Sequence, residues 1–264
     1  MDPMALLDLL GFSTGEVERM VLVLSRLSGL ALSAPFFSRS VGSMRFRAVF
    51  FMAMTVVVYP LVPPWAHEGK GLVGLMFMAV IAEVMVGAVF GLMVHFALVS
   101  TQLAGNIMGF QMGLSMAQVM DPTSGMQEGV LSNLLYMAAL MLFLIMDGHH
   151  LLLEGIVRSF RSIPLGAGLP SAETLLEAVV EAVSKLFVLG IMISAPIIAA
   201  TMLLYLGMGL INRASPQIQV FFLSMPLAQL MGLMIMGVTL AVFAEVFVRE
   251  METFVTLAYR VVGL

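Results

Sequence analysis

The stretch GLVGLMFMAVIAEVMVGAVFGLMVHFALVSTQL, from Gly71 to Leu103, decides what kind of fold this chain can adopt. Its only ionisable side chains are those of Glu83 and His95. A helix that crosses the hydrocarbon core of a bilayer needs about 20 consecutive apolar residues. This run is longer than one span requires and does not alternate with period two, so it predicts a long membrane helix rather than a strand.

The composition of the whole chain supports this prediction. The 264 residues are 61% hydrophobic and 11% charged, with a mean hydropathy of +1.06, whereas soluble domains usually carry about 25% charged residues. Most of the surface must therefore face lipid or other protein. The net charge of −4 gives no reason to expect nucleic acid, and the absence of cysteine excludes disulfides and thiolate metal sites.

Other apolar segments flank this run on both sides. Pro196 and Pro226 lie inside two of them, which predicts kinked helices or hairpins bent back on themselves. We therefore expect an all-α integral membrane protein of long kinked helical hairpins. Asp2, Asp8 and Glu16 stand where a cleaved signal peptide would be basic, so we expect the N-terminus to be retained. The other segments are Val17–Phe37, Phe46–Val62, Val130–Met146 continuing into Leu151–Val157, Leu175–Ile211 and Gln217–Val248.

The distribution of basic residues gives conflicting indications of topology. Arg39, Arg45 and Arg47 mark the first loop as cytoplasmic, but simple alternation then places Arg158 and Arg161 outside. No Lys or Arg occurs from residue 71 to residue 157. Some of these helices are therefore expected not to cross the bilayer as ordinary spans.

Glu83, Gly87, Gly91 and His95 recur every four residues and would form one stripe on a helix. Glycines at this spacing let a second helix approach closely, whereas a carboxylate at the bilayer centre costs several kcal/mol unless it is paired or wetted. The stripe is either a helix-packing seam with a polar clasp or a relay for protons or ions. We favour the seam, because small residues at this spacing serve mainly in packing.

A second stripe follows, with spacings of three, four, four and three residues. It predicts a salt-bridged structural interface in which Glu154 and Arg158 form a buried pair. A metal site would take His149, His150 and Glu154, but adjacent histidines on a helix point to different faces and no third well-spaced ligand appears. We therefore expect neither metal nor cofactor. The stripe consists of Asp147, His150, Glu154, Arg158 and Arg161.

Catalytic signatures are missing from the sequence. It contains no phosphate-binding loop, no zinc-protease motif and no nucleophile elbow. The chain is therefore expected not to be an enzyme.

Four blocks of residues, in a specific order and spacing across nearly the whole chain, carry a resemblance to a known family. They are Arg26-x-x-Gly29 with Pro35-Phe36; Gly109-x-x-x-Gly113 followed by Asp121-Pro122; Asp147-Gly148-His149-His150 leading to Ser159-Phe160 and Pro164; and Ala195-Pro196 before Gly209-Leu210-Ile211-Asn212-Arg213-Ala214-Ser215-Pro216-Gln217. The chain resembles the flagellar export-gate family FliR, shared with the T component of virulence type III secretion. The third block leans toward the flagellar branch.

The resemblance implies a multi-pass protein of the bacterial inner membrane, located in the flagellar basal body. A P-like half, approximately residues 1–170, would be joined to a Q-like half, residues 171–264, as the single R copy in a closed helical ring with FliP-like and FliQ-like subunits. Unfolded rod, hook and filament subunits would pass through the ring. An FlhB-like switch protein would contact its cytoplasmic side, and lipid would surround it.

The connector from Gly109 to Gln127 is then a candidate plug of the pore. Met108, Met112, Met116 and Met120 recur every four residues, as do three glycines one position later, and Asp121-Pro122 would end such a helix. Unbranched thioethers deform at low cost and exclude water, although methionine is also a common core filler. Family members place a loop of this position inside the closed pore. The expected plug residues are Gly109, Met112, Gly113, Met116, Met120, Asp121, Pro122 and Met126.

We also expect a tight turn at Asn212–Pro216, with Arg213 and Pro216 facing the cytoplasm and contacting partner chains. Two other classes of function stay open. One is a proton-coupled secondary transporter that uses Glu83 and His95 as a relay. The other is a membrane-embedded enzyme that uses Asp147, His149 and His150, for which the sequence offers little support.

Overall fold

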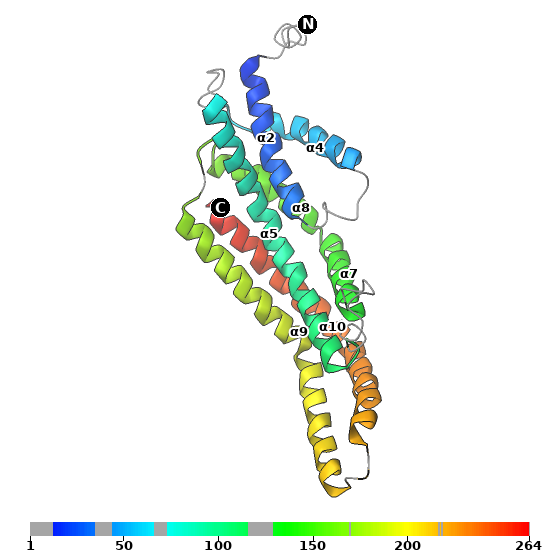
Figure 1. Ribbon diagram of the computed structural model, residues 1–264. Coiled ribbons are helices and arrows are strands. Elements are labelled where there is room, and N and C mark those ends of the chain that lie inside the picture. The colour runs from blue at the N-terminus through cyan, green and yellow to red at the C-terminus, as the bar shows by residue number, and fades with distance from the viewer. Residues whose placement is uncertain are drawn as a thin grey trace. The chain divides into compact units, whose positions relative to one another are not determined.

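The computed structural model describes residues 13–34, 44–65, 73–115, 129–168, 170–215, 217 and 219–263. Within these ranges all regular structure is helical and no strand occurs (Figure 1). This confirms the all-α prediction. The helices are α2 (Thr14–Ser33), α4 (Met44–Val58), the short 3-10 helix η1 (Tyr59–Leu61), α5 (Val73–Gln111), α7 (Val130–Ile145), α8 (Gly148–Ser162), α9 (Ala172–Ala214) and α10 (Val220–Val262).

Three of these helices, α5, α9 and α10, are long and apolar enough to cross a membrane. A fourth span results if α7 and α8 form one interrupted span. The expected span at Phe46–Val62 is instead α4, with 15 residues, followed by η1. Because about 20 residues are needed to span a bilayer, α4 is too short to do so.

Helix α2 begins at a capping box formed by Ser13 and Glu16. The Ser13 backbone N–H donates to the Glu16 carboxylate at 2.8 Å, and this hydrogen bond is the main reason why the pKa of Glu16 lies below its usual value. The Ser13 hydroxyl accepts from the Glu16 backbone N–H in return. The start of α2 is thus set by hydrogen bonds between residues three positions apart.

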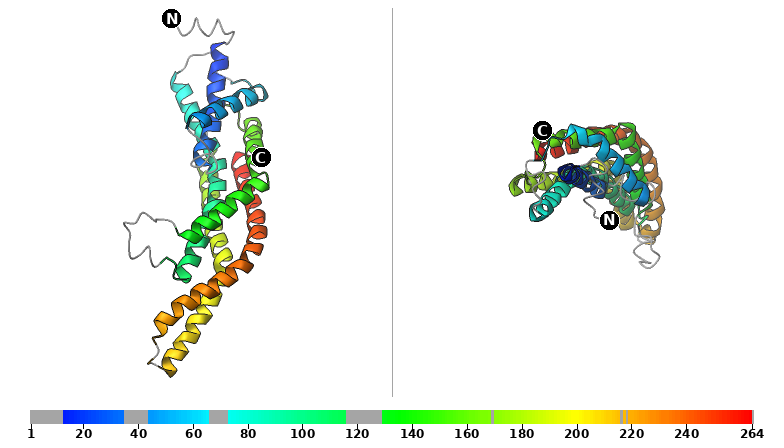
Figure 2. Two further views of the ribbon diagram at one scale, coloured as in Figure 1. Left: turned by 90° about the vertical axis from the view of Figure 1, so that its right-hand side faces the viewer. Right: turned by 90° about the horizontal axis from the view of Figure 1, so that it is seen from above.

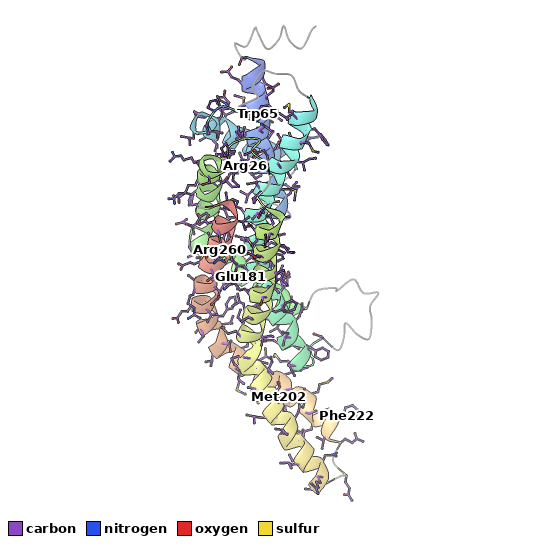
Figure 3. The ribbon with its side chains drawn as sticks, turned by 90° about the vertical axis from the view of Figure 1, so that its left-hand side faces the viewer. Arg26, Trp65, Glu181, Met202, Phe222 and Arg260 are labelled. Carbon is purple, nitrogen blue, oxygen red and sulfur yellow. The ribbon has the colours of Figure 1, made fainter. Side chains whose placement is uncertain are left out.

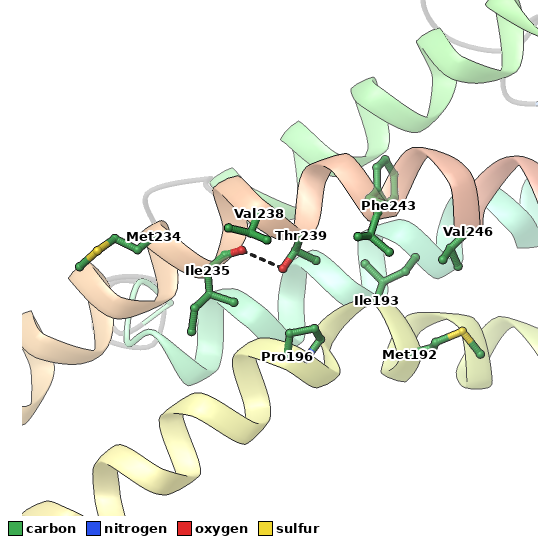
Figure 4. A pocket seen from close by; sticks show the side chains of 10 residues that line it. Met192, Ile193, Pro196, Met234, Ile235, Val238, Thr239, Phe243 and Val246 are labelled. Carbon is green, nitrogen blue, oxygen red and sulfur yellow. Dashed lines mark hydrogen bonds between the residues drawn. The ribbon is translucent and has the colours of Figure 1, made fainter.

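Neither internal proline ends its helix. Pro196 lies inside α9 and Pro226 inside α10, so the apolar segments are single long helices rather than hairpins bent back at their prolines. Figure 4 shows Pro196 on α9 facing α10 across a cavity of about 470 Å³. Among the described residues that line the cavity, Thr239 alone is polar, and its hydroxyl donates to the Ile235 carbonyl at 2.8 Å.

The chain divides into two compact units, and each of the three longest helices contributes to both. The first unit comprises Met1–His95, Asp147–Ala182 and Thr253–Leu264, and the second comprises Phe96–Met146 and Val183–Glu252. These units are defined by packing within the chain. The expected halves at 1–170 and 171–264 concern likeness to other subunits, so they stay a prediction.

In the first unit, the end of α10 packs against α8 and the start of α9. The Tyr259 hydroxyl donates to the Leu151 carbonyl at 3.2 Å, and Gly155 leaves room for the Tyr259 ring. Arg260 donates to Glu181 at 2.9 Å, and Figure 3 shows the two side chains meeting. The last turns of α10 are thus held to α8 and α9 within the first unit.

In the second unit, α9 and α10 run side by side as a hairpin, which Figures 1 and 2 both show. Helix α5 packs closely on α7 there, because a Cβ at Gly105 would lie 2.6 Å from the Ser132 backbone nitrogen. The Ser132 hydroxyl donates to the Gln102 carbonyl at 3.1 Å across the same contact.

Glycines bring α2 and α5 into backbone contact within the first unit. A Cβ at Gly29 would collide with the Val84 carbonyl oxygen, and one at Gly87 would collide with the Arg26 carbonyl oxygen. A Cβ at Gly91 would lie 2.5 Å from the Ala34 nitrogen. Because only glycine permits this approach, the stripe of small residues on α5 acts as a packing seam.

Adding one methyl group to this seam should destabilise the protein. In Gly87→Ala the new Cβ would lie 2.8 Å from the Arg26 carbonyl carbon, and overpacking of this kind costs roughly 1–3 kcal/mol. Gly207→Ala is the matched control, because nothing lies within 4 Å of its Cβ position and alanine is the better helix former. Thermal unfolding in detergent should show a lower midpoint for Gly87→Ala only. Equal midpoints for the two variants would contradict the seam.

Candidate functional site

The largest fully buried polar side chain of the described residues is that of Arg26, on α2, which is 0% exposed. Its Nε donates to Oε2 of Glu83 on α5 at 2.5 Å. Its two terminal nitrogens donate to the Ser159 hydroxyl at 2.9 Å and to the Ile163 carbonyl at 3.0 Å. The guanidinium also lies 4.2 Å from the centre of the Phe160 ring, where a cation–π contact is favourable. One side chain therefore joins α2 to α5, to α8 and to the residue after α8.

Glu83 is 2% exposed and uses both carboxylate oxygens. Oε1 accepts from the Gly166 backbone N–H at 3.0 Å, in the connector between α8 and α9. Gly166 has φ +70°, and a Cβ there would collide with the indole nitrogen of Trp65. Figure 3 labels Arg26 and Trp65 in the same part of the first unit. The carboxylate is thus held by a backbone turn that only glycine fits easily.

This geometry bears on the two interpretations of the stripe on α5, a packing seam with a clasp or a relay. Glu83 has its charge balanced by Arg26 and its second oxygen satisfied by Gly166, as a structural clasp requires. His95 lies three turns further along, roughly 18 Å at 1.5 Å per residue. The positions of the stripe between them are Gly87 and Gly91, which carry no titratable group. The contacts therefore favour a clasp over a proton relay.

Sequence reasoning did not pair Arg26 with Glu83. The two residues are 57 positions apart, and Arg26 entered only as part of a family block. A signal was present, because Glu83 is the only carboxylate in its apolar run and Arg26 lies seven residues from the nearest other charge, and charges in such segments almost always find a partner. Spacing along one helix could not reveal a partner on another helix.

The second stripe differs from its prediction in two respects. Arg158 does donate to Glu154, but their side chains are 61% and 51% exposed, so within this chain the pair is not buried. Asp147 is not part of α8: it is the N-cap residue, with φ 57° and ψ 28°. Arg161 is exposed on the last turn of α8. Whether a partner chain covers this face stays a prediction.

The two histidines do not point to different faces as expected. The ring centres of His149 and His150 are 4.2 Å apart, at an interplanar angle of 36°. The carboxylate that lies near both histidines is that of Asp147 rather than that of Glu154, because the left-handed conformation of Asp147 turns the chain just before α8. Asp147 therefore does not continue the helical stripe as expected.

Helix α5 ends at Gln111, well before the expected stop at Asp121-Pro122. Gly113 adopts φ +72°, its N–H donates to the Phe110 carbonyl at 3.0 Å, and the Leu114 N–H donates to the Gly109 carbonyl at 2.9 Å. This pair of bonds is a Schellman motif. The expected plug residues Met116, Met120, Asp121, Pro122 and Met126 lie outside the described residues.

The end of α5 is anchored on the α9–α10 hairpin within the second unit. Met112 is fully buried, and a Cβ at Gly232 of α10 would lie 2.5–2.8 Å from its side chain. The Tyr205 hydroxyl on α9 donates to the Gln111 carbonyl at 3.1 Å. Met108 is also buried. Met108 and Met112 therefore fill the core, which was the alternative to a role in the plug.

The break between the last two helices starts later than the expected turn at Asn212–Pro216, because Asn212, Arg213 and Ala214 still belong to α9. Helix α9 ends at Ala214 and α10 begins at Val220. Arg213 and Ser215 are exposed, and the Ser215 N–H donates to the Ile211 carbonyl at 2.8 Å. Pro216 lies outside the described residues.

Comparison with known proteins gives a consistent picture. A family profile described as bacterial export proteins, family 1, matches residues 17–254. The flagellar biosynthetic protein FliR of Escherichia coli K12 is 31% identical over 84% of each chain. FliR of Bacillus subtilis 168 is 31% identical over 88% of this chain and 92% of its own. The secretion system apparatus protein SsaT of Salmonella typhimurium LT2 is 26% identical over 75% of this chain and 76% of its own.

Replacing one residue of the Arg26–Glu83 pair should lower the unfolding free energy more than replacing both. Arg26→Leu or Glu83→Leu alone leaves a buried charge without its partner, which costs roughly 3–5 kcal/mol of unfolding free energy, whereas replacing both with apolar residues is often near neutral. The double Leu variant should therefore lose less stability than either single variant. Unfolding titrations of the full chain in mixed detergent micelles measure this difference.

The exposed pair supplies the control for this experiment. Glu154→Ala and Arg158→Ala should each cost no more than about 1 kcal/mol, because solvent screens surface ion pairs. If the two single variants at the clasp behaved like these controls, the Arg26–Glu83 pair would not hold the first unit together.

Proposed function

The chain belongs to the bacterial export proteins, family 1, the family of the FliR proteins, and from this premise we propose that it lines the pore of a type III export gate. It is a membrane-embedded component of a type III export apparatus concerned with flagellum biogenesis. The gate would lie in the bacterial inner membrane at the flagellar basal body. Unfolded flagellar subunits would cross the membrane through it.

The distribution of buried residues supports a subunit that is completed by others. Only 17% of the most apolar window of α10 is buried within the chain, against 56% of that of α5. Met202 on α9 and Phe222 on α10, both labelled in Figure 3, are 61% and 71% exposed. We propose that FliP-like and FliQ-like subunits cover much of this apolar surface, with an FlhB-like protein at the cytoplasmic side and lipid over the rest.

The observation that carries the pore proposal is the way in which α5 ends. Its last carbonyls are capped by a left-handed glycine, and its last side chains are docked on the α9–α10 hairpin. The chain beyond Ser115 therefore starts from a fixed point, and residues 116–127 contain three Met and two Gln without Lys or Arg. Such a segment suits a seal that excludes water at rest and yields to any side chain in use. We propose that residues 116–127 are the plug.

The contacts of Glu83 argue against the alternative of a proton-coupled transporter. A relay carboxylate must exchange its proton, but Glu83 is buried against Arg26 and Gly166. We assign the chain no catalytic role.

Deleting residues 116–127 should make the assembled gate leak. This deletion keeps Gly113 and the Schellman motif, so α5 retains its end and its anchor. Ion conductance of the purified complex in planar bilayers should rise above that of the wild type, while co-purification of the partner subunits stays unchanged.

A Gly-Ser segment of the same length is the matched variant. If methionine side chains make the seal, this replacement should leak as the deletion does, even though it restores the length of the chain. An assembled deletion variant that is as ion-tight as the wild type would exclude these residues as the plug.

The orientation of the last hairpin can be measured separately. The chain has no cysteine, so Ser215→Cys introduces a single thiol at an exposed position beside Arg213. We expect a membrane-impermeant thiol reagent to label it in inverted membrane vesicles and not in intact spheroplasts, because positive charge favours the cytoplasmic side. Labelling from the periplasmic side alone would reverse the proposed orientation.

A further inference from the structure

Three side chains with metal-ligand chemistry converge where α7 gives way to α8. Oδ1 of Asp147 lies 3.3 Å from Nδ1 of His150, and the His149 ring stacks beside that of His150. One ligand atom from each of the three residues lies within 4.8 Å of the others. We propose that Asp147, His149 and His150 bind a divalent cation of the zinc class.

The backbone explains why neighbouring residues can converge here. Asp147 adopts the left-handed conformation, which aspartate tolerates better than most residues, and its carbonyl accepts from the His150 N–H at 2.9 Å. Gly148 follows and is buried as the first residue of α8. The carboxylate is thereby turned back over the first turn of the helix. A straight helix through Asp147 would not place it beside both imidazoles.

The donor set selects the type of ion. Two imidazole nitrogens and one carboxylate oxygen are common zinc ligands, whereas Ca²⁺ and Mg²⁺ prefer oxygen ligands alone. Ligands at about 2.0–2.2 Å in a tetrahedron lie roughly 3.3–3.6 Å from one another. The Asp147–His150 separation already has this value, and rotation of exposed side chains can bring the third ligand atom closer.

Glu154 does not belong to this donor set. It is four residues beyond His150 on α8, but its carboxylate is held by Arg158. The side chains of Asp147 and His150 are 72% and 70% exposed, so an ion would enter from solvent and keep an open coordination position. Water or a ligand from a partner chain would fill that position. The bound ion would tie the residue before α8 to the first turn of the helix.

Zinc binding to the purified full chain tests this proposal. The chain is produced with an affinity tag that contains no histidine and is dialysed in detergent against zinc chloride, and the bound zinc is quantified. The expected result is one zinc ion per chain. Asp147→Gly and His150→Gln should each weaken binding about tenfold or more, since even outer contacts to a metal site contribute about 10–100-fold. Glycine fits the left-handed conformation at position 147, so this variant removes the ligand without straining the backbone.

Two matched variants separate this site from non-specific binding. Glu154→Gln removes the nearest other carboxylate on α8, and His95→Gln removes a histidine elsewhere in the first unit; both should bind zinc as the wild type does. Thermal unfolding confirms that each variant is folded. The proposal is overturned if the wild type binds no stoichiometric zinc, if binding survives in Asp147→Gly and His150→Gln, or if Glu154→Gln loses it instead.

Discussion

The buried ion pair of Arg26 and Glu83 is the constraint on which the first unit depends. Two charges removed from solvent must satisfy each other and their remaining donors and acceptors, or their burial costs several kcal/mol. The pair meets this requirement by drawing together α2, α5, the end of α8 and the turn at Gly166. The glycines of the α2–α5 seam follow from the same requirement, because they bring the two backbones close enough for these side chains to meet.

The second unit is held by different means. Its contacts are those of small residues and methionine, with Gly232 receiving Met112 and Gly105 receiving the Ser132 backbone. Hydroxyls such as that of Thr201 donate to carbonyls of their own helix, so few of them need a hydrogen-bond partner on a neighbouring helix. A unit without a buried ion pair in its described residues can change its packing at lower electrostatic cost.

The all-α fold, the long apolar helices and a break between the last two of them could be predicted from the sequence, because apolar length and charge placement are local properties. The position of that break was predicted too early, since α9 continues to Ala214. The end of α5 and the convergence of Asp147 with His149 and His150 could not. Both depend on single residues with positive φ, Gly113 and Asp147, which helical spacing does not reveal. The partner of Glu83 was also missed, because pairing between helices is a tertiary fact. The pore and the partners were expected from the family resemblance, and the plug from that resemblance together with the spacing of Met and Gly.

The Schellman motif at Gly113 has a further consequence. It satisfies the Gly109 and Phe110 carbonyls at the end of α5, and Tyr205 satisfies that of Gln111, so these groups need no hydrogen bond from the residues that follow Ser115. A segment joined in this way can be displaced, lengthened or replaced without unravelling the helix that carries it. The length and composition of the connector can therefore vary while the helical frame that carries it is kept.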